Sequence, residues 1–258
     1  MKNVSLEELL YGELTARLRR MLEPVAHDSF LFYNDTTELL RADIHKGAQV
    51  LDAGCGRGTL TAWLAEQGCS VVAIDASAER VEHTRALLHE KNLQQRVTLE
   101  ISRLPDAFPM NHFDIILDCF SWWHISDWGR LLTLCRKNLH PEGKVVILDT
   151  FFGWKTTLEF RQEMREKWQT ALPTFNECRN MLIKREFRLL KTDPIQEAYV
   201  KYLDALYAKV QEFEKEDLGT SDPLELGEVK TMLEWFRNAA HKEELAATRM
   251  VAELTESD

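Results

Sequence analysis

The chain has 258 residues, of which 45% are hydrophobic and 29% charged, and its formal net charge is −10. This balance is typical of one large globular domain, and the acidic total argues against a dedicated nucleic-acid or anionic-membrane surface. The five cysteines include no C-x-x-C pair and no histidines pair at metal-ligand spacing, so neither a disulfide framework nor a metal is expected. Without a signal-peptide layout or an apolar run of roughly 20 residues, the sequence predicts a soluble cytoplasmic protein with a small-molecule substrate.

Two helices are predicted at the N-terminus, over residues 5–23 and 35–46, and strands then alternate with helices. The next expected elements are, in chain order, a strand at 48–54, a helix at 59–67, a strand at 70–75, a helix at 77–92, strands at 97–101 and 113–118, a helix at 126–138 and a strand at 144–150. Strands separated by helices indicate a parallel sheet that is covered on both faces. The apolar runs VVAI, DIIL and VVIL are typical of strands buried on both sides.

The second part of the chain has a different pattern. The expected elements are an aromatic helical segment from residue 151, a helix at 175–186, a strand at 187–192, helices at 195–216 and 224–241 and a strand at 245–254. This helical material is too long for a simple connection, which indicates a cap over the sheet. The predicted organisation is therefore N-terminal helices (1–46), a ligand-binding core (47–150) and cap helices with closing strands of the same domain (151–258).

The stretch VLDAGCGRG, residues 50–58, places three glycines directly after a strand. Glycine buries no side chain, so a ligand is expected close to this backbone, where the helix N-terminus presents free N–H groups. The G-x-G-x-G spacing differs from the G-x-G-x-x-G of dinucleotide folds and favours a nucleoside without a diphosphate. Asp75, at the end of the second strand, can accept hydrogen bonds from ribose hydroxyls, and Asp52 can balance a ligand ammonium group.

These residues resemble the class I S-adenosylmethionine (SAM)-dependent methyltransferases. VLDAGCGRG is similar to the first motif of that family and VVAIDAS to its second. FDIILDCFSWWHI and LLTLCRKNLHPEGKVVILD resemble its central strand, helix and Pro-x-Gly turn. The resemblance covers about residues 48–150 and implies a Rossmann-like, seven-stranded, mostly parallel α/β sheet with helices on both faces, plus the N-terminal helices and the cap.

The resemblance also assigns the residues around the cofactor SAM. Gly54, Gly56 and Asp52 are expected at its amino-acid end, Asp75 at the ribose and Ala76 at the adenine edge. Many relatives have an acidic residue for the adenine amino group after the third strand, but this chain reads ISRLP, so Ser102 or the backbone is expected to substitute. Cys55, as a small packing residue, and Asp118 complete the expected cofactor side.

Aromatic residues after the fourth and fifth strands are candidates for binding the methyl acceptor. The residues proposed for this role are Trp122, Trp123, Phe151 and Trp154, together with Tyr11 and Tyr33 from the N-terminal segment. The competing interpretation is that these side chains simply pack in the core. His124 is the predicted catalytic residue, as a base for a hydroxyl or protonated amine, because the imidazole pKa is ordinarily near neutral. The acceptor pocket is expected between the 122–124 loop and the cap.

The predicted activity is transfer of a methyl group from SAM to an N-, O- or C-nucleophile of a small molecule. The helical insertion between the last two strands resembles the layout of phosphoethanolamine N-methyltransferases and cyclopropane fatty acid synthase relatives. A nucleic-acid or protein methyltransferase stays an alternative, although DCFS stands where DNA base-amino methyltransferases have Asn/Asp-Pro-Pro-aromatic. A SAM-binding protein without methyl transfer is the other alternative. The sequence gives no indication of the oligomeric state.

Overall fold

The protein is described from a computed structural model that covers residues 37–38, 40–168, 170–216 and 223–255. The predicted helix at 5–23, the DLGTSD part of the predicted turn before Pro223, and Tyr11 and Tyr33 lie outside these residues. The predicted helix at 35–46 is shorter within them, because helical structure ends at Arg41.

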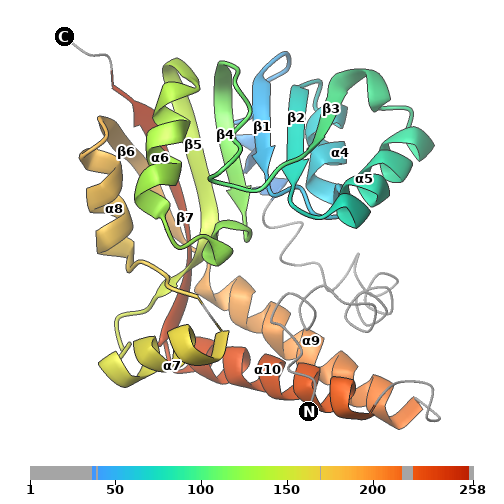
Figure 1. Cartoon of the computed structure of the whole chain (residues 1–258), viewed down its shortest axis with the longest axis vertical. Helices are drawn as coiled ribbons and strands as arrows, with labels where there is room; N and C mark the ends of the chain where they lie inside the picture. Colours follow the sequence, from blue (N-terminus) through green and yellow to red (C-terminus); the bar gives the residue numbers. More distant parts are fainter. Residues whose placement is uncertain (1–36, 39, 169, 217–222, 256–258) are drawn as a thin grey trace. The chain divides into compact units, whose positions relative to one another are not determined.

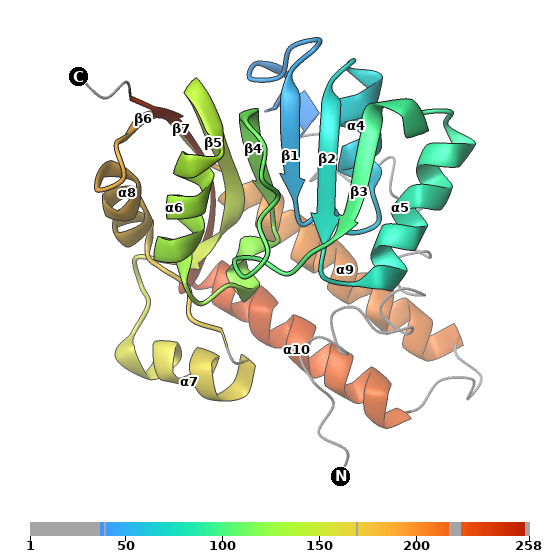
Figure 2. The same ribbon diagram turned by 45° about the horizontal axis from the view of Figure 1, so that its top comes forward.

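Seven strands form one mixed, mostly parallel sheet with the order β3-β2-β1-β4-β5-β7-β6 (Figures 1 and 2). The strands are β1 (Gln49–Ala53), β2 (Ser70–Asp75), β3 (Val97–Ile101), β4 (Phe113–Cys119), β5 (Leu139–Phe152), β6 (Phe187–Pro194) and β7 (Leu245–Leu254). Strands β3, β2, β1, β4 and β5 pair in parallel, whereas β6 and β7 pair antiparallel. The predicted α/β sheet is confirmed.

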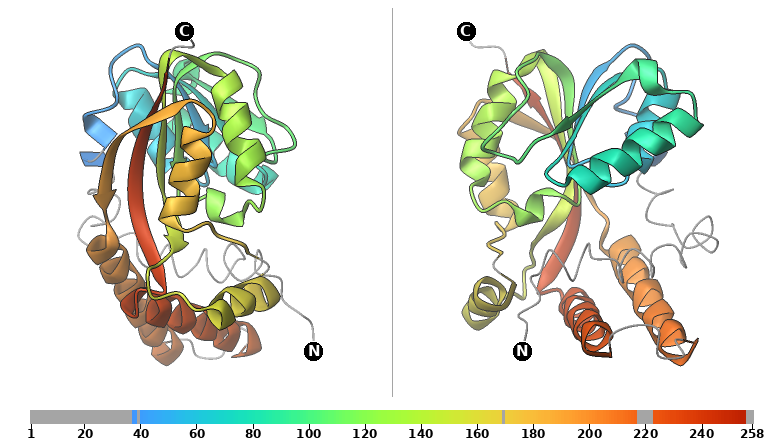
Figure 3. Two further views of the ribbon diagram at one scale, coloured as in Figure 1. Left: turned by 90° about the vertical axis from the view of Figure 1, so that its left-hand side faces the viewer. Right: turned by 45° about the vertical axis from the view of Figure 1, so that its right-hand side comes forward.

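The helices of the described residues follow the sheet in chain order. They are α4 (Thr59–Glu66), α5 (Ala78–Glu90), α6 (Trp128–Lys137), α7 (Leu158–Trp168), α8 (Phe175–Ile183), α9 (Gln196–Glu216) and α10 (Pro223–His241), with 3₁₀ turns η1 (Gln94–Arg96) and η2 (Trp122–His124). Helix α4 packs against α5 and α6 against α8, and Figure 3 shows these two pairs on opposite sides of the sheet. None of the described helices is both long and apolar enough to cross a membrane.

The central strands are buried because their apolar side chains face helices on both sides. In β1 and β4, Val50, Leu51, Ile116 and Leu117 have no accessible surface. The register pairs Leu51 with Ile116, so β4 extends only one residue beyond β1 at each end. Their carboxyl ends therefore meet at one edge of the sheet, which is where open α/β sheets bind ligands.

Two element boundaries differ from the sequence-based prediction. Strand β5 begins at Leu139 and not at 144, since Leu139 already pairs with Phe113 before a register shift. Helix α6 begins at Trp128 and not at 126, because the side chain of Asp127 caps it by accepting a hydrogen bond from the backbone N–H of Arg130 at 2.8 Å. The residues before this cap form the separate turn η2.

The aromatic segment after residue 150 is also less helical than predicted. Strand β5 continues to Phe152, and α7 begins only at Leu158. The backbone N–H of Gly153 donates to the carbonyl of Glu244 at 2.8 Å. A Cβ atom at Gly153 would lie 2.0 Å from the Glu243 carbonyl oxygen, so this close approach requires glycine.

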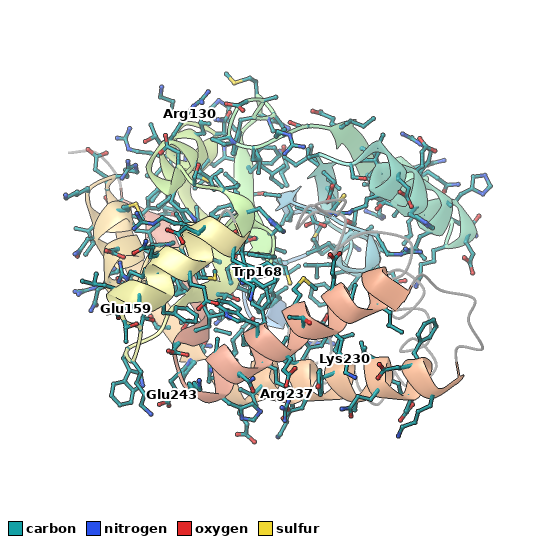
Figure 4. The ribbon with its side chains drawn as sticks, turned by 60° about the horizontal axis from the view of Figure 1, so that its bottom comes forward. Arg130, Glu159, Trp168, Lys230, Arg237 and Glu243 are labelled. Atoms are coloured by element: carbon teal, nitrogen blue, oxygen red, sulfur yellow. The ribbon has the colours of Figure 1, made fainter. Side chains whose placement is uncertain are left out.

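The described chain divides into two compact units. One contains residues 37–38, 152–168, 195–216 and 223–246; the other contains residues 40–151, 170–194 and 247–255. In the first unit, α9 and α10 pack along each other. The Trp235 ring stacks on Phe160 with centroids 4.9 Å apart and contacts Trp168 of α7, which is labelled in Figure 4. This aromatic cluster fixes α7 on α10.

The second unit contains the sheet edge described above and a buried ionic network. Arg249 on β7 has no accessible surface, and its guanidinium donates to the carboxylate of Asp193 on β6 at 2.5 Å. It also forms an ion pair with Asp43, which precedes β1. Arg249 thus links the antiparallel strands β6 and β7 to the segment that precedes the central strand β1.

Candidate functional site

The three glycines of the loop after β1 have two kinds of surroundings. All three have positive φ angles, 114° at Gly54, 55° at Gly56 and 84° at Gly58, in a region that favours glycine. A Cβ atom at Gly54 would lie 2.3 Å from the side chain of Ser121, and one at Gly58 would lie 2.5 Å from Thr84. At Gly56 a Cβ atom would have no neighbour within 4 Å. Protein atoms crowd the first and third glycines, so open space for a ligand lies over Gly56.

Asp75 connects the carboxyl end of β2 to this loop. Its Oδ2 accepts a hydrogen bond from the backbone N–H of Gly56 at 3.0 Å, and its Oδ1 accepts one from Ser77 at 2.9 Å. The guanidinium of Arg80, in the first turn of α5, lies 3.5 Å from Oδ2. The carboxylate is mostly buried. Oδ2 already accepts from Gly56 and Arg80, whereas Oδ1 keeps a second lone pair for a ligand hydroxyl.

The residues expected at the adenine end flank Asp75. Ala76 follows it and is exposed, and the backbone N–H of Ser102, after β3, donates to the carbonyl of Asp75 at 2.9 Å. The Ser102 hydroxyl donates to the carbonyl of Ala107 within its own loop. Its hydrogen is therefore already used, although the oxygen can still accept.

Asp52, on β1, and Cys55, within the loop, are both buried. Asp52 is 2% exposed, and its Oδ2 accepts a hydrogen bond from the Thr61 hydroxyl of α4 at 2.6 Å. Burial raises the pKa of Asp52 to about 6, against the opposing effect of the Thr61 hydrogen bond. Burial and then the charges of Asp52 and Asp75 raise the pKa of the Cys55 thiol, so this sulfur is a packing group and not a nucleophile.

The turn η2 is fixed to the ends of two strands by buried carboxyl groups. Asp118, at the end of β4, accepts hydrogen bonds on Oδ1 from the backbone N–H groups of Ser121 and Trp122, both at 3.1 Å. Asp149, on β5, accepts one from the backbone N–H of Trp123 at 2.9 Å. Both carboxyl groups have no accessible surface. The two buried carboxyl groups thus fix the backbone of three consecutive residues, 121–123.

The three predicted residues of η2 are placed differently. Trp122 has no accessible surface, and its indole N–H donates to the carbonyl of Ala53 at 3.2 Å. Trp123 is half-buried, and its ring centroid lies 3.8 Å from that of the exposed His124. Protein atoms around the His124 ring, and then the charge of Arg80, lower its pKa to about 4. The two side chains available to a ligand are therefore an aromatic ring and a neutral imidazole.

Three predicted contact residues do not fit a direct ligand contact in this structure. Asp118, Trp122 and Phe151 have no accessible surface, so they have nothing to offer a ligand. Phe151 packs instead against Trp128, with ring centroids 5.8 Å apart. Trp154, in the other unit, is 78% exposed and has the Lys155 ammonium 4.6 Å above its ring.

Several residues with a role at this site were missed in the sequence. Thr61 and Thr84 bond Asp52 and the Gly56 carbonyl, Ser121 fills the space beside Gly54, and Asp149 holds Trp123. Only Asp149 had a local signal, as an acidic residue that directly follows the apolar run VVIL of a buried strand. The others are small polar side chains whose partners lie far along the chain.

The residues present fit a nucleoside with a charged amino-acid end. Gly56 provides open space over a left-handed backbone, Asp75 provides carboxylate lone pairs, and α4 begins directly after the loop. Among the described residues, no group of three or more His, Cys, Asp or Glu side chains is placed to hold a metal ion.

Comparison with known proteins agrees with this geometry. Residues 51–147 match the family described as "Methyltransferase domain". The chain is 29% identical to a ubiquinone biosynthesis O-methyltransferase of Rhodopseudomonas palustris over 111 residues. This alignment covers 43% of each protein. The chain thus spans less than half the length of that curated relative.

Two solved structures share the fold at low identity. Phosphoethanolamine N-methyltransferase 2 of Haemonchus contortus, in complex with phosphomonomethylethanolamine and S-adenosylhomocysteine, superposes with a TM-score of 0.76 at 17% identity, covering 99% of this chain and 61% of that one. The cyclopropane synthase MmaA2 of Mycobacterium tuberculosis superposes with a TM-score of 0.73 at 16% identity, covering 81% and 79%. The family match includes the glycine loop and identifies residues 51–147 as a methyltransferase domain, and these two structures share its fold.

Proposed function

We propose that the protein transfers a methyl group from SAM to a small-molecule acceptor with an N-, O- or C-nucleophile. The observation that carries this proposal is the pairing of Gly56 with Asp75. It holds open backbone and a carboxylate side by side at the carboxyl ends of β1 and β2. A loop of this kind accommodates a nucleoside, and its spacing lacks the turn that a pyrophosphate needs.

On the cofactor side, each residue is given one role. Asp75 would accept hydrogen bonds from the ribose hydroxyls, and the N-terminus of α4 would face the carboxylate of the amino-acid end. Asp52 is buried on β1, just before the loop, and would act on the ligand ammonium through its charge. Bound SAM supplies a methyl group that is already activated by the sulfonium charge. The chain then has to align the acceptor and exclude water, which can provide roughly 7 to 11 kcal/mol.

On the acceptor side, we assign binding to Trp123 and His124. A half-buried aromatic ring suits a planar or cationic acceptor. An imidazole with a pKa of about 4 is neutral at physiological pH and holds a proton weakly. We therefore propose that His124 accepts a hydrogen bond from the acceptor and orients it, in preference to the full proton removal predicted from the sequence.

The substrate class is inferred from the named relatives. Those relatives include a magnesium-protoporphyrin O-methyltransferase of Rhodobacter capsulatus, 32% identical over 96 residues, and the ubiquinone biosynthesis enzyme. Both names refer to small organic molecules, which supports a small-molecule acceptor over a nucleic acid or protein. A cytoplasmic location stays a prediction from the sequence.

A methyltransferase assay tests this function. The purified full chain is incubated with SAM and a panel of phenols, amines and enolisable ketones, and release of S-adenosylhomocysteine is measured. We expect release that depends on one class of acceptor and is reduced at least tenfold in Asp75→Asn. Release driven only by added RNA, DNA or protein would contradict the assignment. With an acceptor in hand, His124→Gln should raise KM more than it lowers kcat if the residue orients the substrate.

A further inference from the structure

The buried carboxyl groups of Asp118 and Asp149 interact with each other, and both accept hydrogen bonds from backbone N–H groups of η2. They lie on neighbouring parallel strands, β4 and β5, and both are fully buried. Among the described residues, no lysine, arginine or histidine forms an ion pair with either of them. Two buried carboxylates without a cation repel each other strongly, so such a pair is expected to retain a proton.

The hydrogen-bond donors around the pair show where this proton is needed. Asp149 accepts from the backbone N–H of Thr150 on Oδ1 and of Trp123 on Oδ2. Asp118 Oδ1 accepts from the backbone N–H groups of Ser121 and Trp122. Asp118 Oδ2, in contrast, is buried without any N–H or O–H donor. Of the four carboxyl oxygens of Asp118 and Asp149, it is the one that receives no hydrogen bond.

The hydroxyl of Ser121 leads to the same conclusion. Its Oγ lies 2.6 Å from the carbonyl oxygen of Ala53 and 2.7 Å from Asp118 Oδ1. Its two acceptors are this carbonyl and Oδ1, so the Ser121 hydroxyl does not supply a hydrogen to Oδ2.

We propose that Asp118 carries a proton on Oδ2, donates it to Asp149, and with Asp149 forms a singly charged pair that positions η2, and with it Trp123 and His124, for the acceptor. Both are positioning residues, since neither has surface to touch a ligand. The role in acceptor binding rests on the proposed function, whereas the shared proton does not.

The surroundings favour retention of this proton near neutral pH. Burial is the largest cause that raises the pKa of Asp149 to about 7, and burial followed by the charge of Asp149 raises the pKa of Asp118 well above its usual range. The titratable groups influenced by the pair are the thiols of Cys119 on β4, Cys135 on α6 and Cys178 on α8, whose pKa values are all raised, first by burial. Asp52 on β1 also acts on Cys119, as a further acidic group. None of these groups can neutralise a second negative charge.

An Asp→Asn substitution keeps the shape of the side chain. Made separately at Asp118 and at Asp149, it distinguishes a shared proton from a merely structural role of the pair. In Asp118→Asn the amide NH₂ replaces the O–H toward Asp149, and the amide oxygen keeps the N–H bonds of η2. In Asp149→Asn the NH₂ must face an N–H group, of either Trp123 or Thr150, and one of these bonds is lost. A matched control is Asp114→Asn, on the same strand β4, whose carboxylate accepts the backbone N–H of Gln49.

Two measurements on the full chain decide the proposal without an acceptor. Infrared spectra at pH 8 should show the C=O stretch of a protonated carboxylic acid in wild type and in Asp114→Asn, and should lack it in Asp118→Asn. Hydrogen exchange should speed up at least tenfold at Trp123 or at Thr150 in Asp149→Asn, and less than threefold at both in Asp118→Asn. The absence of the acid band in wild type, or equal exchange in the two variants, would overturn the shared proton. Failure of S-adenosylhomocysteine to bind to wild type would instead overturn the proposed function and leave these two readouts intact.

Discussion

The carboxylate of Asp75 accepts a hydrogen bond from the backbone N–H of Gly56 at 3.0 Å, across 19 residues of sequence. This bond sets the glycine loop beside the end of β2, so that open backbone and an anionic acceptor lie together. The proposed cofactor site depends on this relationship, and it can be tested from both of its ends.

At the aspartate, Asp75→Asn should weaken binding of S-adenosylhomocysteine at least tenfold while the protein stays folded. The reason is that hydrogen bonds to a charged group contribute about 1.5 to 3 kcal/mol each, and the amide replaces one acceptor by a donor. Calorimetric titration gives the dissociation constant, and far-UV circular dichroism confirms the fold. Asp106→Asn, at an exposed ion pair with Arg130, is the control that should bind normally. Equal dissociation constants for Asp75→Asn and wild type would move the ribose contact elsewhere.

At the glycines, Gly54→Ala and Gly56→Ala should have different effects. A methyl group at Gly54 collides with Ser121, whereas one at Gly56 enters open space. Gly54→Ala is therefore expected to lower the unfolding free energy by about 3 kcal/mol or more, and Gly56→Ala by only about 1 to 2 kcal/mol for its left-handed backbone. Gly56→Ala should nevertheless lose most of its affinity for S-adenosylhomocysteine. Urea unfolding measures the free energies, and calorimetric titration measures the affinity for S-adenosylhomocysteine. Normal ligand affinity in Gly56→Ala would show that no ligand covers this residue.

Asp52 makes stability depend on pH. Its pKa in the folded protein, about 6, lies above the ordinary value of 3.8, so the fold binds this proton more tightly. The stability that results is present below pH 4 and is lost as the pH rises to 6. Asp52→Asn removes this loss, so its unfolding free energy relative to wild type should rise by roughly 2 to 3 kcal/mol between pH 4 and pH 7.5. Urea unfolding at both pH values tests it, and a difference that does not change with pH would refute the buried ionisation.

The buried arginine of β7 should be essential for stability. Arg249→Gln leaves the Asp43 and Asp193 carboxylates without their shared cation, and breaking a buried ion pair costs about 3 to 5 kcal/mol. The matched control is Arg188→Gln on β6, because the Arg188 side chain is 65% exposed in its ion pair with Glu253. That exposed pair should contribute less than about 1 kcal/mol. Similar urea midpoints for the two variants would rule out a structural role for the Arg249 network.

Much of the fold could be predicted because its signals are local. Apolar runs gave β1, β2 and β4 nearly to the residue, and Ser77 and Asp127, at the starts of α5 and α6, are polar residues that cap helices. The glycine loop and Asp75 were also recognisable, since their spacing reflects a strand, a turn and a helix in succession.

The contacts that determine the roles of individual residues could not be predicted. Gly54 is a glycine because Ser121 lies against it, and Trp122 can be buried in the core without a lost hydrogen bond because its indole N–H donates to the carbonyl of Ala53. Both partners come from distant positions on another strand end, and no periodicity along the chain records them. The same holds for Asp149, whose hydrogen bond to Trp123 depends on the pairing of β4 with β5.

The central claim is that the loop at Gly56 and the Asp75 carboxylate bind S-adenosylmethionine. Calorimetric titration of the purified wild-type chain with S-adenosylhomocysteine, and separately with NAD, tests it most directly. The account predicts saturable binding of S-adenosylhomocysteine with one site per chain and no measurable heat with NAD, because the loop lacks the turn for a pyrophosphate. Binding of NAD that is tighter than binding of S-adenosylhomocysteine would contradict it.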